Sequence, residues 1–194
     1  MKWLIASDIH GSAKYCAELL KAFSREGADR LFLLGDILYH GPRNPLPEGY
    51  DPMRTAALLN GMKHRISCIR GNCDSEVDQM VLEFPIMAEY ALIAEGETVI
   101  HAVHGLKLGE GELPKLGQGE VLLHGHTHIP ECVYRNGVLF CDPGSVSLPK
   151  AGSERGYMTL EGGVLRWFTL GGTEYMSKRL GAEQEVISEG ENDV

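Results

Sequence analysis

The chain has 194 residues, 43% of them hydrophobic and 23% charged, which is the composition of an ordinary globular protein with one substantial core. Its formal net charge is −9, but the last twelve residues hold five acidic groups and no basic one, so the preceding body carries only about −4. An acidic body without a basic stripe is poorly suited to a nucleic-acid backbone, and no apolar run approaches the roughly 18–20 residues that span a bilayer.

The first half of the chain alternates strand and helix patterns. Apolar runs over residues 2–7 and 31–34 predict two short buried strands. Between them, Ser12 is suited to cap a helix and Gly27 to end it. The buried face of this helix follows the helical spacing of Cys16, Leu19, Leu20 and Phe23.

A loop and a second helix follow. Residues 40–52 contain four prolines and two glycines, which predicts a loop. Asp51 and Pro52 predict the cap and first turn of a helix that ends near Met62. Residues 65–69 predict a third strand, and Asp74 is the predicted cap of a short helix over residues 75–82.

The second half of the chain predicts hairpins. Strands over residues 89–94 and 97–103 are joined at Glu95-Gly96, and residues 120–123 form a further strand. Residues 132–140 contain Asn136-Gly137, the strongest short hairpin signal, and residues 156–170 predict another hairpin. The change from a βαβαβ pattern to hairpins predicts a layered α/β domain with mixed, partly antiparallel sheets.

We expect residues 1–180 to form one domain and residues 181–194 to be an acidic, solvated C-terminal tail. The five cysteines are an odd number without a CxxC pair, which favours reduced thiols. The first ten residues contain too short an apolar stretch for a secretion signal. A cytoplasmic protein is therefore expected.

Each of the predicted strands that carries a motif ends in a small polar cluster. Strand ends at one edge of a sheet lie close together in space, so polar side chains remote in sequence can converge there. The clusters contain seven oxygen or nitrogen donors: Asp8, His10, Asp36, Asn72, His104, His126 and His128. Strand alternation would place Asp8 with His10, and His126 with His128, on one face. Such donors suit Mn²⁺, Fe²⁺ or Zn²⁺, and seven are too many for one ion but suit two ions that share a carboxylate.

The motifs D-x-H, G-D, G-N-x-[DE], H-G and G-H-x-H, in this order, resemble those of the calcineurin-like metallophosphoesterase superfamily. A closer similarity is to its small single-domain bacterial branch, the YfcE-type phosphodiesterases, through 34-LGDILYHGPRN-44, 70-RGNCDSEVDQM-80, 125-GHTH-128 and 142-DPGSVSLPK-150. The resemblance covers roughly residues 1–170. It implies the metallophosphoesterase fold, a four-layer α/β/β/α sandwich with the metals at the strand ends.

The resemblance also implies how the ligands are shared. One divalent ion would take Asp8, His10, Asp36 and His128, and the second Asp36, Asn72, His104 and His126. Mn²⁺ is the first choice for both ions, with Fe²⁺, Zn²⁺ or Ni²⁺ as alternatives. The implied enzyme hydrolyses a small or activated phosphodiester by attack of a hydroxide that bridges the two metals.

Two departures from the family pattern affect this expectation. Cys73 stands where many relatives have a histidine on the leaving-group side, and a thiol is the poorer proton donor. Slow turnover and a preference for aryl or other activated diesters are therefore expected. After His104, many relatives have a second histidine where this chain has Leu106, which removes one outer contact.

Three residues near the ligands are candidates for substrate binding. Arg43 and His40 lie in the proline-rich loop after Asp36, where a guanidinium or an imidazole can reach a phosphate. Cys73 is next to a ligand and is expected to line the substrate pocket. The predicted catalytic set is Asp36, Asn72, His104, Cys73 and Arg43.

The other histidines and cysteines have structural interpretations. His124 lies inside a strand, where a buried, hydrogen-bonded histidine is the ordinary outcome, so metal ligation is the less favoured alternative. His101 is expected on a strand face and His64 in solvent near a helix end. The cysteines other than Cys73 are expected in the core. Asp142, where relatives often have asparagine, is expected to support the site from behind.

The expected partner is a small phosphodiester, with no membrane and no nucleic acid, and a homo-oligomer is left open. Three alternatives use the same fold. A protein-interaction scaffold, as in a retromer subunit, would have lost ligand histidines, which this chain keeps. A nuclease would carry a basic surface, and a protein phosphatase would have histidine in place of Cys73.

Overall fold

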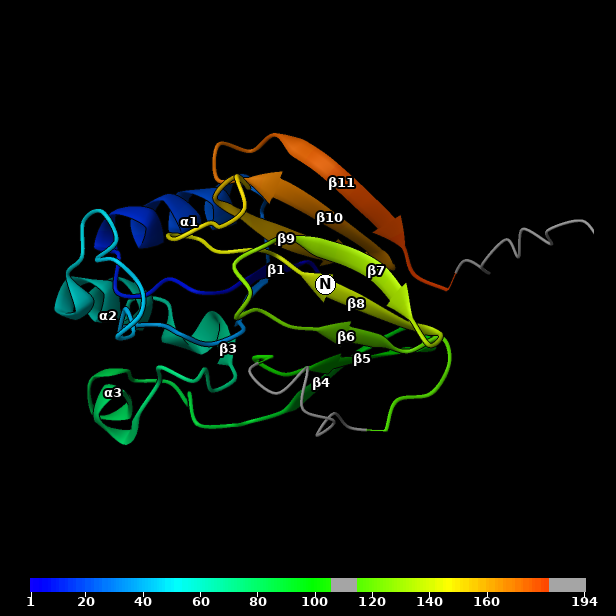
Figure 1. Ribbon diagram of the computed structural model, residues 1–194, viewed down its shortest axis with the longest axis horizontal. Helices are drawn as coiled ribbons and strands as arrows, with labels where there is room; N and C mark the ends of the chain where they lie inside the picture. The colour runs from blue at the N-terminus through cyan, green and yellow to red at the C-terminus, as the bar shows by residue number, and fades with distance from the viewer. Residues whose placement is uncertain (106–114, 182–194) are drawn as a thin grey trace, which may run out of the picture.

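Two β-sheets packed face to face form the centre of the molecule (Figure 1). The computed structural model describes residues 1–105 and 115–181. Within them, the first sheet has the order β11 (Glu174–Arg179), β10 (Val164–Thr169), β9 (Gly156–Glu161), β1 (Trp3–Ala6), β2 (Arg30–Leu33) and β3 (Ile66–Cys68). The second has the order β4 (Ala91–Glu95), β5 (Thr98–Ala102), β6 (Val121–Leu123), β8 (Val138–Asp142) and β7 (Glu131–Arg135). Leu106 and residues 182–194 of the acidic tail lie outside the described residues.

The βαβαβ half is built as its sequence predicts. Strand β1 pairs in parallel with β2, and β2 in parallel with β3. Helix α1 (Ala13–Arg25) begins where the Ser12 side chain accepts a hydrogen bond from the backbone N–H of Tyr15. Helix α2 (Pro52–Asn60) begins where Asp51 caps the N–H of Arg54, with proline in the first turn. A short 3₁₀ helix, η1 (Lys63–Arg65), leads into β3 and leaves His64 exposed, as expected.

The predicted cap of the third helix is wrong. Helix α3 (Glu76–Val81) is capped by Ser75, which forms a capping box with Asp78. Asp74 instead turns inward, where it is buried and its carboxylate accepts hydrogen bonds from the backbone N–H groups of Asp36, Ile37 and Gly71 at 2.7–2.8 Å. These three donors lie in the turns after β2 and β3, so Asp74 ties together two loops that carry predicted ligands.

The second half consists of hairpins at the predicted places. Strands β4 and β5 are antiparallel, as are β7 and β8, which turn at Asn136 and Gly137 with positive φ at both residues. Strands β5, β6 and β8 are parallel neighbours. Strand β11 at the sheet edge was not predicted, because its residues are mostly exposed and polar and give no clear apolar alternation.

The core has two main parts, one on each side of the first sheet. Ile5, Phe32 and Trp167 of the first sheet pack between the sheets against side chains such as Ile100 and Leu139 of the second. On the other side of the first sheet, residues of α1 and α2 pack against Leu4, Leu31 and Leu33.

Figure 1 shows helices α1, α2 and α3 grouped at one side of the molecule. The outer face of the second sheet carries, in the part of the chain that is described, the small cluster of Leu122, Val138 and Phe140 and no helix. The mixed α/β class with two packed sheets is confirmed, whereas the described residues supply three of the four layers expected for an α/β/β/α sandwich. No described helix has the length and apolarity needed to cross a membrane.

Candidate metal centre

The seven predicted ligands converge on one edge of the two sheets. Parallel strands β1, β2 and β3 deliver Asp8, His10, Asp36 and Asn72 just beyond their carboxyl ends, and β5 and β6 do the same for His104, His126 and His128. Hydrogen bonds link the loops after these strands, since the N–H of His10 donates to the carbonyl of Asp36 at 2.9 Å. Side chains 118 positions apart in sequence therefore meet, as His10 and His128 show at 3.2 Å between their Nε2 atoms.

An unusual backbone conformation aims most of these side chains. Five of the seven have positive φ: Asp8 (58°), His10 (48°), Asp36 (56°), His126 (68°) and His128 (62°). The left-handed conformation destabilises the folded state by about 1–3 kcal/mol for each non-glycine residue that adopts it, and such residues cluster at functional sites. Strand alternation was expected to place Asp8 with His10, and His126 with His128, on one face. That expectation is wrong, because these residues lie beyond the strands and left-handed turns direct their side chains.

The first group of donors is formed by Asp8, His10 and His128. The Asp8 Oδ1 atom lies 3.5 Å from His10 Nε2 and 3.3 Å from His128 Nε2. All three residues are buried, and the Asp8 Oδ1 atom has no hydrogen-bond partner among the described residues. On the far side of each ring, Nδ1 lies 2.8 Å from the Tyr39 carbonyl in His10 and 2.6 Å from the Leu148 carbonyl in His128.

These contacts fix the tautomers. In the neutral ring, an Nδ1 that donates to a carbonyl leaves Nε2 with a free lone pair. Two such Nε2 atoms and a carboxylate oxygen therefore face one another with their lone pairs. Nitrogen and oxygen lone pairs of this kind are the ligands of a divalent cation. The residues present therefore fit a metal ion.

The second group is formed by Asp36, His104 and His126, whose ligand atoms also lie within 4.8 Å of one another. His104 Nε2 lies 3.4 Å from Asp36 Oδ2 and 3.0 Å from Asn72 Oδ1, while its Nδ1 donates to the Leu34 carbonyl at 2.7 Å. Asp36 Oδ2 is also 3.7 Å from His10 Nε2 of the first group. Asp36 thus lies between the two groups.

The pKa shifts follow from this crowding. Burial disfavours the charged form of His104, but the hydrogen bond to Asp36 and the charges of Asp8 and Asp36 outweigh it and raise its pKa to about 9. Burial likewise opposes ionisation of Asp8, yet the adjacent His10 and His128 rings, together with the nearby His104, hold its pKa well below the usual range. The pKa of His126 is lowered by burial and by the neighbouring His104. The site stabilises the carboxylates in their ionised form and attracts positive charge.

Buried polar groups hold the Asp8 loop from behind. The hydroxyls of Ser145 and Ser147 both donate to the Asp8 carbonyl, at 2.8 and 3.1 Å. The backbone N–H of His126 donates to Asp8 Oδ2 at 3.1 Å. Gly125 makes this approach possible, because a Cβ there would lie 2.0 Å from the Ser7 hydroxyl oxygen and 2.9 Å from Asp8 Oδ2.

His124 is buried and hydrogen-bonded away from the ligand groups, as its sequence position indicates. Its Nε2 lies 3.1 Å from Glu131 Oε2 and its Nδ1 lies 3.3 Å from Asp142 Oδ2. Asp142 also accepts a 2.7 Å hydrogen bond from the Thr127 hydroxyl. This network supports the GHTH segment from behind. His101 lies on a face of β5, between Tyr90 and Glu120.

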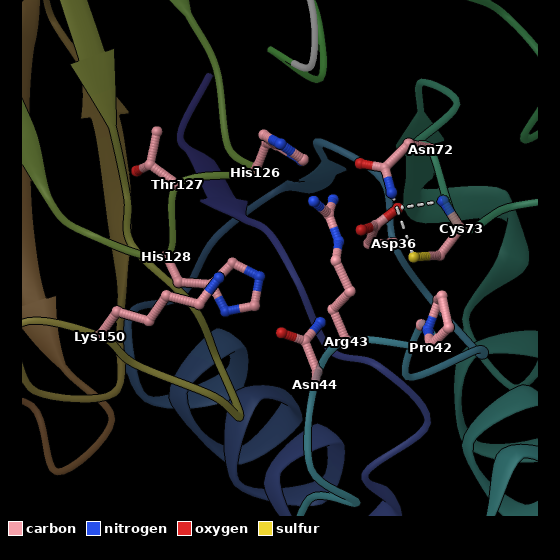
Figure 2. A pocket seen from close by; sticks show the side chains of 11 residues that line it. Asp36, Pro42, Arg43, Asn44, Asn72, Cys73, His126, Thr127, His128 and Lys150 are labelled. Atoms are coloured by element: carbon pink, nitrogen blue, oxygen red, sulfur yellow. Dashed lines mark hydrogen bonds between the residues drawn. The ribbon is translucent and has the colours of Figure 1, made fainter.

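A cavity of about 450 Å³ opens beside the ligands (Figure 2). Its lining includes the predicted Arg43 and Cys73, and also Asn44, Thr127 and Lys150, which the sequence did not single out. His40 is not part of the lining. Its ring packs edge-on between Tyr39 and Tyr50, so the structure gives it a position in the loop rather than at the substrate cavity.

Cys73 is held at the wall of this cavity. Its backbone N–H donates to Asp36 Oδ1 at 2.7 Å, and its sulfur accepts a 3.2 Å hydrogen bond from the Asn72 amide (Figure 2). Burial and the nearby charge of Asp36 raise the pKa of the thiol well above its ordinary value. Cys16, Cys68 and Cys141 are buried, as expected, and Cys132 is half-buried.

Comparison with known proteins agrees with this geometry. Residues 1–162 match the calcineurin-like phosphoesterase superfamily domain, and the chain belongs to this superfamily. It is 46% identical over 165 residues to the phosphodiesterase YfcE of Escherichia coli strain K12, covering 85% of this chain and 90% of that protein. Membership of a metallophosphoesterase family implies divalent metal ions.

Two solved structures extend the comparison. The phosphoesterase YfcE from Escherichia coli superposes with a TM-score of 0.87 at 42% identity, covering 93% of this chain and all of that one. Vps29 from Entamoeba histolytica, solved with Zn²⁺, has a TM-score of 0.58 at 19% identity, covering 93% of this chain and 98% of that one. The second similarity shows a shared fold. The metallophosphoesterase fold predicted from the motifs is confirmed.

Proposed function

We propose that this protein hydrolyses a small or activated phosphodiester with the help of two divalent metal ions. The observation that carries the proposal is the position of Asp36 between two groups of imidazole and carboxylate donors, 3.7 Å from His10 in one and 3.4 Å from His104 in the other. The 46% identity to a phosphodiesterase supports the choice of substrate class.

The residues suggest how two ions would be held. Asp8, His10 and His128 would hold one ion, Asn72, His104 and His126 would hold the other, and Asp36 would contribute to both. A pair of divalent ions in such a site supplies Lewis acidity toward a phosphoryl oxygen and lowers the pKa of water toward neutrality. Nitrogen and oxygen donors favour Mn²⁺, Fe²⁺, Zn²⁺ or Ni²⁺, with Mn²⁺ as our first choice.

The donor set also determines the charge of the site. Four of the proposed ligands are imidazoles and one is a neutral amide, so only Asp8 and Asp36 subtract from the positive charge of the ions. A net positive centre attracts an anionic diester, whereas a set composed only of carboxylates would repel it. This is the physical reason for a histidine-rich site.

Arg43 and Cys73 are the proposed substrate contacts among the predicted residues. Arg43 is exposed at the cavity, and Figure 2 shows its side chain directed toward the region of Asp36 and Asn72. A guanidinium there can bind phosphoryl oxygens with two parallel hydrogen bonds. We leave His40 out of this set because it packs between two tyrosines.

Cys73 limits the leaving group. A thiol whose pKa is raised is a weak acid, so it does not protonate a departing alkoxide efficiently. The substrates best suited to this site therefore have leaving groups that depart without protonation, such as phenolates. This favours diesters with an aryl or comparably stable leaving group.

None of the three alternatives is favoured, and Cys73 already argues against a protein phosphatase. A scaffold of the same fold needs no intact donor set, yet all seven donors converge here. A nuclease needs a basic surface, while the chain before its last twelve residues carries a formal net charge of about −4. The proposed partner of this protein is thus a small diester. Its five cysteines are an odd number without a CxxC pair, which favours reduced thiols and a cytoplasmic location.

Reconstitution tests the proposal. Metal-free protein is reloaded separately with Mn²⁺, Fe²⁺, Zn²⁺, Ni²⁺ and Mg²⁺ and assayed with bis-p-nitrophenyl phosphate and with p-nitrophenyl phosphate. We expect metal-dependent release of p-nitrophenolate, faster from the diester. Absence of hydrolysis with every metal would favour the scaffold, and a faster reaction with the monoester would contradict the proposed substrate class.

A further inference from the structure

Lys150 is a cation at the cavity that the proposed metal centre does not use. It lies in the segment after β8 and lines the cavity together with His128, Thr127 and Arg43. Figure 2 shows Lys150 alongside His128, while Arg43 enters from the side of Asn44 and Pro42. Two cationic side chains therefore approach the same cavity from different segments of the chain.

The backbone around Lys150 is firmly held against a proposed metal ligand. The N–H of Lys150 donates to the His128 carbonyl at 3.1 Å, and the Lys150 carbonyl accepts hydrogen bonds from the N–H and hydroxyl of Ser153 at 3.0 and 2.7 Å. Two residues before Lys150, the Leu148 carbonyl accepts from Nδ1 of His128. The turn that orients His128 thus also fixes where the Lys150 side chain begins.

Among the described residues, no neighbouring carboxylate balances the charge of Lys150. Across residues 1–105 and 115–181, no acidic group lies within ion-pair distance of Lys150 or of Arg43. The cavity lining contains a single carboxylate, Asp36, which is directed to His10 and His104. A diester phosphate carries one negative charge, which the metal centre and Arg43 already match. The cation at position 150 therefore exceeds what the reacting group requires.

We propose that Lys150 determines specificity by binding a second anionic group of the substrate, so that preferred diesters carry a carboxylate or phosphate beyond the reacting phosphodiester. This inference rests on the proposed phosphodiesterase function and narrows its substrate class. Lys150 is exposed, so its contribution is that of a solvated ion pair, worth about a two- to fivefold change in KM.

Three diesters with the same p-nitrophenolate leaving group and different retained groups test the proposal: phenyl, 4-carboxyphenyl and choline. The full-length, metal-loaded protein is compared with Lys150→Ala, Lys150→Glu and Lys150→Arg. Lys21→Ala is the matched control, because Lys21 is an exposed lysine of α1 that pairs with Glu18 far along the chain from the cavity residues. Circular dichroism confirms that each variant is folded.

For Lys150→Ala, we expect KM to rise about two- to fivefold for the carboxyphenyl ester alone, with kcat unchanged within twofold. Lys150→Arg should keep the KM for the carboxyphenyl ester close to that of the unaltered protein. Lys150→Glu should shift the substrate preference from the carboxyphenyl ester to the choline ester. The effect should weaken at high salt. If Lys150→Ala changed KM equally for all three esters, or changed it for none of them, the inference would be overturned while the phosphodiesterase proposal stayed intact. Failure of the unaltered protein to hydrolyse any of them would overturn both.

Discussion

The Nε2 atoms of His10 and His128 face each other at 3.2 Å, and the Nδ1 atom of each ring is hydrogen-bonded to a backbone carbonyl. With Nδ1 protonated in both rings, the two facing nitrogens are acceptors, and Asp8 adds a carboxylate oxygen 3.3 Å from His128. Between neutral rings this arrangement is repulsive unless a proton or a metal ion lies between the three atoms. The fold therefore positions acceptors at a cost that metal binding offsets.

The first prediction concerns thermal stability. Adding Mn²⁺ at about 100 times its Kd to metal-free protein should stabilise the folded state by about 2.7 kcal/mol for each ion bound, which raises Tm by about 5–10 °C per ion for a chain of this size. His128→Ala should lose most of this increase, because it removes one of the facing acceptors. His64 is exposed, so His64→Ala is the control and should keep the metal-dependent increase in Tm. An equal increase in His128→Ala, measured by differential scanning calorimetry, would show that the ion binds elsewhere.

The second prediction concerns pH and His124. Burial opposes its charge, but Asp142 and Glu131 outweigh burial and raise its pKa from 6.5 to about 9. The folded state therefore holds this proton more tightly than the unfolded chain. The stability that His124 contributes should be complete below pH 6.5 and should be lost as pH rises through about 9.

Urea unfolding of the metal-loaded protein between pH 6 and pH 10 measures this loss, because bound metal keeps the ligand histidines from taking part. His124→Gln retains a polar side chain without the titration, so its free energy of unfolding should vary less over the same interval. Parallel curves for the two proteins would rule out the proton assignment at His124.

The third prediction concerns Cys73 and the leaving group. In a series of aryl diesters, kcat should fall as the pKa of the leaving phenol rises, because the Cys73 thiol is a poor proton donor. Cys73→His should raise the rate of the poorest leaving groups by about tenfold or more and flatten the dependence. Cys73→Ser serves as the size-matched control and should keep the steep slope. Rates that do not depend on the leaving group in the unaltered protein would refute the idea.

The fourth prediction concerns Arg43. Loss of a bidentate, charge-assisted contact to phosphate costs about 1.5–3 kcal/mol, so Arg43→Ala should lower kcat/KM by about 10- to 100-fold. Arg43→Lys keeps the charge but not the planar fork and should recover only part of the loss. Arg54→Ala changes an exposed arginine of α2 and should have no effect. Unchanged kinetics in Arg43→Ala would remove Arg43 from the proposed site.

Most of the fold could be predicted because its strands and helix caps are local features. The buried runs that form β1 and β2, and the caps at Ser12 and Asp51, are visible in a few adjacent residues. Asp74 shows where local reasoning fails. Its carboxylate could cap a helix, but three backbone N–H groups in the turns after β2 and β3 compete for it, and that competition exists only in the folded chain.

The convergence of the seven donors at the strand ends was predictable, but their geometry and the rest of the cavity lining were not. The ordered motifs identify the donors, because nitrogen and oxygen side chains at successive strand ends have few structural explanations. The left-handed φ of residues such as Asp8 and His126 could not be predicted, since their side chains disfavour that conformation and only the surrounding contacts impose it. Lys150 was missed because an exposed lysine has no local pattern. Its importance depends on the hydrogen bond between its backbone and His128.

The most direct test of the account is the number of metal ions per chain in Asp36→Asn. Asp36 lies near both donor groups, at 3.7 Å from His10 and 3.4 Å from His104. The control is Asp29→Asn, which changes a surface carboxylate that accepts from the Lys2 backbone. Elemental analysis of desalted, Mn²⁺-loaded protein should give two ions per chain for the unaltered protein and the control, and one or fewer for Asp36→Asn. Saturation of the unaltered protein at a single ion, or two ions retained in Asp36→Asn, would contradict a centre in which Asp36 is shared.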